Sequence, residues 1–182
     1  ERRLCCSSRE DSKTFNQYID LNKKSQPFSP DTLEQHWNSD YMKNIRVDLM
    51  QGKEVPQCQV CNGKLLSVAT YRTHFNKLYE NQIDEAYEKT KDDGYTDMNV
   101  TSWDYRFNNL CNFKCRMCGD MLSSSWEAEN KETGDWNPDK PSQMWMRKDI
   151  KAEIDKFHDK VIVNEFKDAI EAKSIKEIYW CG

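Results

Sequence analysis

The stretch "TSWDYRFNNLCNFKCRMCGD", residues 101–120, joins an alternating segment to the densest group of cysteines in the chain. In its first half, aromatic residues occupy alternate positions: Trp103, Tyr105 and Phe107. A period of two is typical of a β-strand with one apolar face. In its second half, three cysteines form a C-x3-C-x2-C pattern: Cys111, Cys115 and Cys118. The stretch therefore predicts a strand followed at once by a loop of clustered thiols.

The residues after the loop predict helices and then a second strand. "MLSSSWEAENKE", residues 121–132, favours a helix, and "TGDWNPDKPSQ", residues 133–143, favours a loop because of its Gly, Pro and Asn content. Apolar residues then recur at helical spacing: Ile150, Ile154, Phe157, Val161, Phe166 and Ile170. "SIKEIYWCG", residues 174–182, is a short apolar strand. A strand, helices and a strand form a crossover unit, which predicts two parallel strands.

The polar positions of the first strand leave two interpretations open. An antiparallel surface strand alternates in the same way, whereas the polar face of a barrel strand lines the lumen. Asp104 and Arg106 would then contact substrate or cofactor, or form an ion pair on the strand. Asn109 and Asn112 are expected to form hydrogen bonds within the cysteine loop. The "SSSW" segment, residues 123–126, is expected on a helix surface or against a cofactor.

The first third of the chain predicts short helices around a second cysteine pair. Ser29 and Pro30 are expected to begin one helix, and Ser39 another that ends at Gly52. The second helix has an apolar face that consists of Met42, Ile45 and Leu49. "KEVPQCQVCNGK", residues 53–64, is expected to be a knuckle-like loop that carries Cys58 and Cys61. One long helix is expected over residues 65–91.

Composition excludes several classes of protein. The 182 residues carry a net charge of −4, with charges of both signs interspersed, so no basic stripe for sequence-independent nucleic-acid binding is present. No run approaches the roughly 20 apolar residues of a membrane span. The eight cysteines occur mostly in tight groups, which suits thiolates on a metal in a reducing cytoplasm better than disulfides.

The triple-cysteine loop is a candidate metal site. In parallel α/β folds, chemistry lies at the carboxyl ends of the strands, which is where Cys111 follows Phe107. Three thiolates leave one corner of a four-cysteine iron–sulfur cluster open, and open metal sites are the catalytic ones. Zinc is the alternative, although a structural zinc site takes four ligands. The third possibility is three buried structural cysteines.

The loop "NNLCNFKCRMCG" resembles that of radical S-adenosylmethionine (SAM) enzymes. The resemblance implies a (β/α)6 barrel, here only its opening β-α-β portion, and a [4Fe–4S] cluster on Cys111, Cys115 and Cys118. The open iron of that cluster would chelate SAM, and reductive cleavage would give a 5′-deoxyadenosyl radical that abstracts a substrate hydrogen. Met117 and Asn112 are expected at the cofactor. Gly182 is similar to the first glycine of the Gly-Gly-Glu motif that holds the methionyl amine.

The other cysteines resemble the ligands of a twitch-type auxiliary cluster domain, which is half of a SPASM domain. The resemblance implies a second [4Fe–4S] cluster held by Cys5, Cys58 and Cys61, with Cys6 as the spare cysteine. A zinc site, or no bound metal, is the alternative there. The implied division is a partial twitch-like domain over residues 1–64, a linker helix over 65–99 and the beginning of the barrel over 100–182.

The resemblance therefore implies a radical SAM enzyme, and the grouping of the cysteines favours the cytoplasm. We expect the chain to be a fragment, since it begins without Met and ends directly after an apolar run. A fragment with about two of the six barrel strands is expected to be inactive by itself. The substrate would be a peptide, a protein or a small molecule, and a reductant such as flavodoxin or ferredoxin would be a partner. The alternatives are a zinc-stabilised binding module and a non-catalytic iron–sulfur electron-transfer protein.

Overall fold

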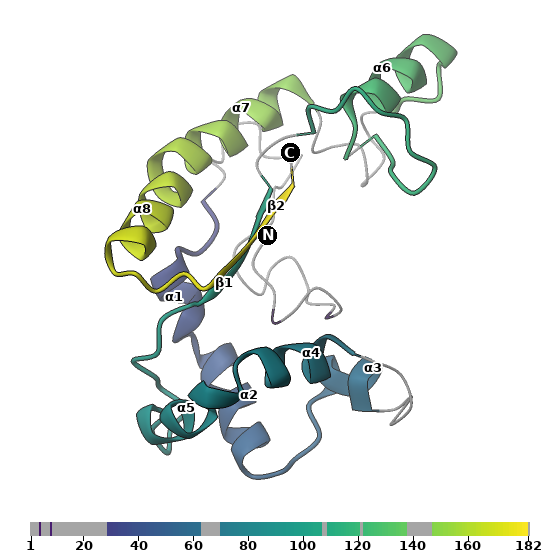
Figure 1. Ribbon diagram of the computed structural model, residues 1–182. Helices are drawn as coiled ribbons and strands as arrows, with labels where there is room; N and C mark the ends of the chain where they lie inside the picture. Colours follow the sequence, from purple (N-terminus) through teal and green to yellow (C-terminus); the bar gives the residue numbers. More distant parts are fainter. Residues whose placement is uncertain are drawn as a thin grey trace. The chain divides into compact units, whose positions relative to one another are not determined.

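The chain has a mixed, mostly helical fold with a two-stranded parallel sheet in its described part (Figure 1). The computed structural model describes Leu4, Ser8 and residues 29–62, 70–106, 109–120, 122–137 and 147–181. Four residues named by the sequence analysis lie outside this part: Cys5, Cys6, Phe107 and Gly182. The chain divides into two units, one containing Ser29–Asn99 and the other containing Val100–Gly182, and each is described by itself. No helix in these ranges is long and apolar enough to cross a bilayer.

The first described helix of the first unit starts later than expected. Helix α1 is Leu33–Trp37, and its N-cap is Thr32 rather than Ser29. Thr32 accepts a hydrogen bond from the backbone N–H of Gln35, and the Gln35 side chain accepts one from the backbone N–H of Thr32. This reciprocal capping box satisfies two N–H groups at once, which the Ser29–Pro30 pair does not do.

Helix α2, Asp40–Met50, follows the prediction. The hydroxyl of Ser39 accepts from the backbone N–H of Met42 at 3.3 Å, and Gly52 follows the helix with a φ of +68°. Met42 and Ile45 on its apolar face are buried. Burial of this face against the rest of the unit supplies most of the stabilisation of such a helix.

Arg46 of α2 ties the end of this unit to the corner between α1 and α2. Its guanidinium donates to the backbone carbonyls of Trp37 and Gly94 and, at 3.3 Å, to Oδ1 of Asn38. The Arg46 guanidinium carbon also lies 4.6 Å from the centroid of the Trp37 ring. The Trp37 indole donates to the carbonyl of Met98 at 2.7 Å. Residues about 50 positions apart are thus held in contact by polar and cation–π interactions.

Two predictions for this unit are wrong. Residues 56–62 form a 3₁₀ turn, η1 (Pro56–Cys58), and a short helix, α3 (Gln59–Asn62), where a knuckle-like loop was expected. The single helix expected over 65–91 is broken in its described part into α4 (Tyr71–Leu78), a 3₁₀ turn η2 (Glu80–Gln82) and α5 (Ile83–Lys89). Tyr79 leaves the helical region at φ −110° and ψ 23°, which ends α4. The described part of the expected linker belongs to the first unit.

The second unit contains the predicted crossover. Strands β1 (Ser102–Arg106) and β2 (Glu177–Cys181) pair in parallel, with Trp103 opposite Ile178 and Asp104 opposite Tyr179. The parallel pairing is confirmed, and an antiparallel pairing of these strands is excluded.

Helices cover one face of this sheet (Figure 1). Along the chain, the two strands are connected by α6 (Ser124–Thr133), α7 (Lys148–Phe157), a π-helical turn η4 (His158–Ile162) and α8 (Val163–Glu171). The buried rings of Trp103 and Tyr105 pack against Phe166 of α8, with ring centroids 5.6 and 4.9 Å away. The hydroxyl of Tyr105 lies 2.9 Å from Nε2 of His158. Trp103 and Tyr105 thus form the core face, as their spacing predicted, whereas Phe107 lies outside the described residues.

Gly94 is expected to be intolerant of any side chain. A Cβ there would lie 2.2 Å from the carbonyl oxygen of Lys43, and its φ of +81° disfavours L-residues. Gly52 in the same unit shares the positive φ, but a Cβ there meets nothing within 4 Å. Gly52→Ala should lower the free energy of unfolding by about 1 to 2 kcal/mol. Gly94→Ala should cost at least about 2 kcal/mol more because of the clash. Denaturant unfolding of both variants checks this, and equal losses would contradict the close contact.

Candidate functional site

The cysteine loop, defined here as residues 109–120, lies beyond the carboxyl end of β1. Cys111 and Cys118 are partly exposed and Cys115 is exposed, and all three thiols are free of disulfide bonds. Within the described residues, no three His, Cys, Asp or Glu side chains are gathered closely enough to hold a metal ion. The structure therefore places the three thiols on one accessible loop without converging them.

The first turn of α6 holds the backbone of this loop. Ser124 and Ser125 donate hydroxyl hydrogen bonds to the carbonyl of Cys111 at 3.1 and 2.9 Å. The backbone N–H of Cys111 donates to the Ser124 hydroxyl at 3.1 Å, and the N–H of Ser124 donates to the carbonyl of Asn109 at 2.7 Å. The position of the first cysteine is thus set by side chains that follow the last one.

Ser123 and Trp126 extend this hold to the middle of the loop. Ser123, of which only 1% is exposed, donates to the carbonyl of Phe113 at 2.6 Å and also caps α6. The indole N–H of Trp126 donates to the carbonyl of Cys115 at 3.1 Å. That carbonyl also accepts the N–H of Cys118 at 3.0 Å, which closes a turn between the second and third cysteines.

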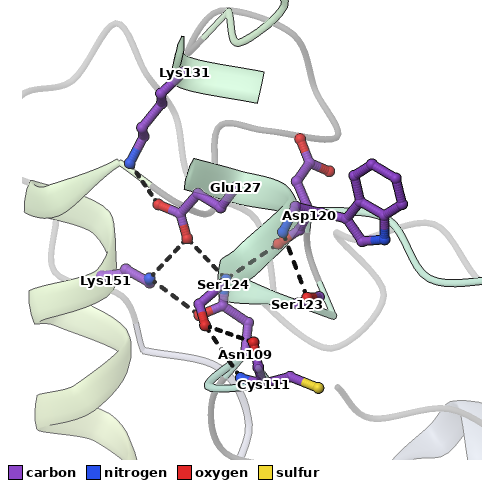
Figure 2. A network of polar contacts seen from close by, with 9 residues as sticks. Asn109, Cys111, Asp120, Ser123, Ser124, Glu127, Lys131 and Lys151 are labelled. Carbon is purple, nitrogen blue, oxygen red and sulfur yellow. Dashed lines mark hydrogen bonds and ion pairs between the residues drawn. The ribbon is translucent and has the colours of Figure 1, made fainter. Parts of the chain in front are cut away.

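A buried carboxylate fastens the base of the loop (Figure 2). Glu127 of α6 accepts hydrogen bonds from Asn109 at 2.8 Å and from Lys131 at 2.6 Å. Lys151 of α7 lies 3.4 Å from the same carboxylate and donates to Oδ1 of Asn109 at 3.3 Å. Asn109 also donates to the carbonyl of Asp120, so that it bridges both ends of the loop, and its expected hydrogen bond within the loop is confirmed.

The charge state of Glu127 follows from these contacts. Burial of Glu127 on its own raises its pKa, because a buried carboxylate loses hydration. The hydrogen bonds from Lys131 and Asn109 and the positive charges of both lysines outweigh that effect. The net pKa is below its ordinary value of 4.5. Glu127 is therefore ionised near neutral pH, and its carboxylate is a strong hydrogen-bond acceptor for the side-chain amide of Asn109.

The remaining predicted residues whose side chains the structure describes lie at or near the surface. Met117 is 96% exposed, and Asn112 is exposed beside Cys111. Asp104 is exposed on the sheet face opposite Trp103 and Tyr105, whereas the side chain of Arg106 lies outside the description. Cys58 and Cys61 are half-exposed, three positions apart in consecutive helical turns. Their expected fellow ligand Cys5, like Gly182, lies outside the described residues.

Sequence reasoning missed the residues that hold the loop. The "SSSW" segment was expected on a helix surface or against a cofactor, yet the four side chains bond to loop carbonyls. Glu127 and Lys151 were assigned no role. The available signal was weak: three consecutive serines before a helical pattern, directly after a cysteine cluster, indicate more hydroxyl donors than one N-cap needs.

Comparisons of the chain with protein-family models, curated proteins and solved structures give no match.

Glu127 is expected to make stability depend on pH. Because its folded-state pKa is lowered, its contribution is present above pH 4.5 and is lost as pH falls below that value. Glu127→Gln should lower the free energy of unfolding by about 1 to 2 kcal/mol at neutral pH. The difference from wild type should shrink in acid. Denaturant unfolding across the pH range checks this, with Glu132→Gln, an exposed position on α6, as the control. A gap that persists below the lowered pKa would contradict the assignment.

Proposed function

We propose that the chain is part of a radical SAM enzyme and that its cysteine loop binds a [4Fe–4S] cluster. The observation that carries this proposal is the placement of three disulfide-free thiols on one loop beyond the carboxyl end of β1. That strand belongs to a parallel β-α-β crossover, and the carboxyl ends of parallel strands are where α/β folds place their chemistry.

The donor chemistry suits an iron–sulfur cluster. Cys111, Cys115 and Cys118 are soft thiolate ligands, and three of them leave one iron open to a further ligand. Their side chains would have to turn toward one another, because the described residues contain no converged group. The exposure of the loop leaves room for that movement. When bound, the cluster would supply the electron that cleaves SAM reductively and so generates the radical for hydrogen abstraction.

The chain's own residues would position the cofactor and substrate. Met117 is fully open to solvent, which suits contact with an apolar ring such as adenine. Asn112 offers an exposed amide beside the first cysteine. Asp104 and Tyr179 are paired neighbours on the exposed sheet face, which in a closed barrel would face the lumen and the substrate. Gly182 would hold the methionyl amine of SAM.

The finer architecture also belongs to this proposal. The two parallel strands would be the opening portion of a (β/α)6 barrel, and residues 1–64 would form a partial twitch-like domain. In that domain Cys58 and Cys61 would hold a second [4Fe–4S] cluster with Cys5. Both thiols are partly exposed, so that a cluster could reach them. A flavodoxin or ferredoxin would supply electrons, and the substrate would be a peptide, a protein or a small molecule.

Iron, sulfide and zinc per chain after anaerobic reconstitution provide the first test. Wild type should bind about four irons per cluster. A Cys111/Cys115/Cys118→Ala variant should lose one such complement, whereas Cys6→Ala, the expected spare, should lose none. Addition of SAM to the reduced wild type should change its EPR signal, because one iron is open. If the chain bound one zinc and no iron, the radical SAM proposal would be wrong, and a zinc-stabilised binding module would take its place.

The second cluster is tested separately. Cys58→Ala/Cys61→Ala should remove about four irons while the SAM-dependent change in the EPR signal remains. The reason is that these thiols lie in a different unit from the cysteine loop. Unchanged iron content in this variant would mean that the pair holds no cluster. Loss of the SAM response would mean that the open iron is held by Cys58 and Cys61 and not by the cysteine loop.

A further inference from the structure

The cysteine loop has little apolar packing of its own. Leu110 and Phe113 are mostly exposed, as is Met117, and every residue from Asn112 to Met117 is exposed. A loop without buried apolar side chains must be ordered by its hydrogen bonds or remain mobile. The side-chain hydrogen bonds to the carbonyls of Cys111, Phe113 and Cys115 all come from Ser123–Trp126, at the start of α6.

These hydrogen bonds follow a regular pattern. The acceptors are alternate carbonyls of the loop, those of Cys111, Phe113 and Cys115. The donors are side chains at four consecutive positions: Ser123, Ser124, Ser125 and Trp126. One helical turn therefore determines the orientation of three peptide groups.

The direction of the intervening N–H groups follows from peptide geometry. In a planar trans peptide, the C=O of one residue and the N–H of the next point in opposite directions. Since three carbonyls point at α6, the N–H groups of Asn112, Lys114 and Arg116 point away from it. Thiolates and cluster sulfides accept hydrogen bonds from N–H groups, and such bonds tune the reduction potential of an iron–sulfur cluster. The partially negative carbonyl oxygens of Cys111, Phe113 and Cys115 point toward α6, and so away from the side on which these N–H groups lie.

We propose that the first turn of α6 is a template that sets the backbone of the cysteine loop before any metal binds, and that presents three N–H groups on the side away from the helix to thiolate and sulfide acceptors. Ser125 and Trp126 are positioning residues, since they act through the carbonyls of Cys111 and Cys115. The consequence for cluster binding rests on the proposed function, whereas the preformed loop does not.

Two conservative variants isolate the template. Ser125→Ala removes one hydroxyl donor without touching the cap of α6, which is Ser123. Trp126→Phe removes the indole N–H and keeps an aromatic ring. Ser125→Thr restores a hydroxyl. Thr133→Ala is the matched control, because its hydroxyl bonds at the other end of the same helix, to Asn130 and Asp135.

Amide hydrogen exchange of the metal-free 182-residue chain, resolved by NMR, is the experiment. In wild type the amides of Cys111 and Cys118 should exchange more slowly than unstructured amides, because both donate hydrogen bonds in the loop. Ser125→Ala and Trp126→Phe should each speed this exchange by about three- to ten-fold, the effect of one neutral hydrogen bond. Ser125→Thr and Thr133→Ala should match wild type.

Unprotected amides in metal-free wild type, or variants that leave the exchange unchanged, would overturn the template. Iron uptake by the same proteins separates this inference from the proposed function. Slower reconstitution of Ser125→Ala and Trp126→Phe supports both. Protected amides without any iron uptake would leave the template standing and remove the radical SAM proposal.

Discussion

The parallel pairing of β1 with β2 is the constraint on which the second unit depends. Two parallel neighbours cannot be joined by a tight turn, so the chain must leave one end of β1 and return to the other end through a long connection. That connection contains the helices that bury Trp103 and Tyr105. It also places the cysteine loop at its very start, between the end of β1 and the first turn of α6.

This arrangement explains why the loop and α6 are interdependent. Ser123 directly precedes the helix, caps it and also bonds to the loop. The buried Glu127, one turn later, holds Asn109 at the loop's base, and Lys151 brings α7 to the same carboxylate. A charge that is buried must be paired, and here the pairing joins two helices and a loop. The same groups therefore stabilise the unit and shape its most chemically distinctive segment.

Much of the second unit could be predicted from sequence because its signals are periodic. Alternating aromatics indicated β1, helical spacing indicated α7 and α8, and the order of elements indicated parallel pairing. The first unit was harder. The capping box at Thr32 competes with a plausible start at Ser29, and nothing in the apolar spacing marks the break at Tyr79.

The support of the loop could not be predicted for a different reason. Its bonds end on backbone carbonyls, which every residue possesses, so the acceptors leave no trace in the sequence. Only the donors are visible, and serines before a helix commonly serve as caps while tryptophans commonly fill cores. The ionic network around Glu127 joins positions 18 and 24 residues apart along the chain, and no local pattern reveals such pairs.

The π-helical turn His158–Ile162 explains an irregular step in the apolar pattern. Ile150, Ile154, Phe157 and Val161 are separated by four, three and four residues, but Phe166, which packs against the strand, comes five residues after Val161. In an uninterrupted α-helix a step of five would carry Phe166 about 140° around the axis from Val161. A wider turn absorbs one extra residue and returns Phe166 to the sheet. The helix thus behaves as one that has accommodated a single-residue insertion, keeping both halves in phase with the strands they cover.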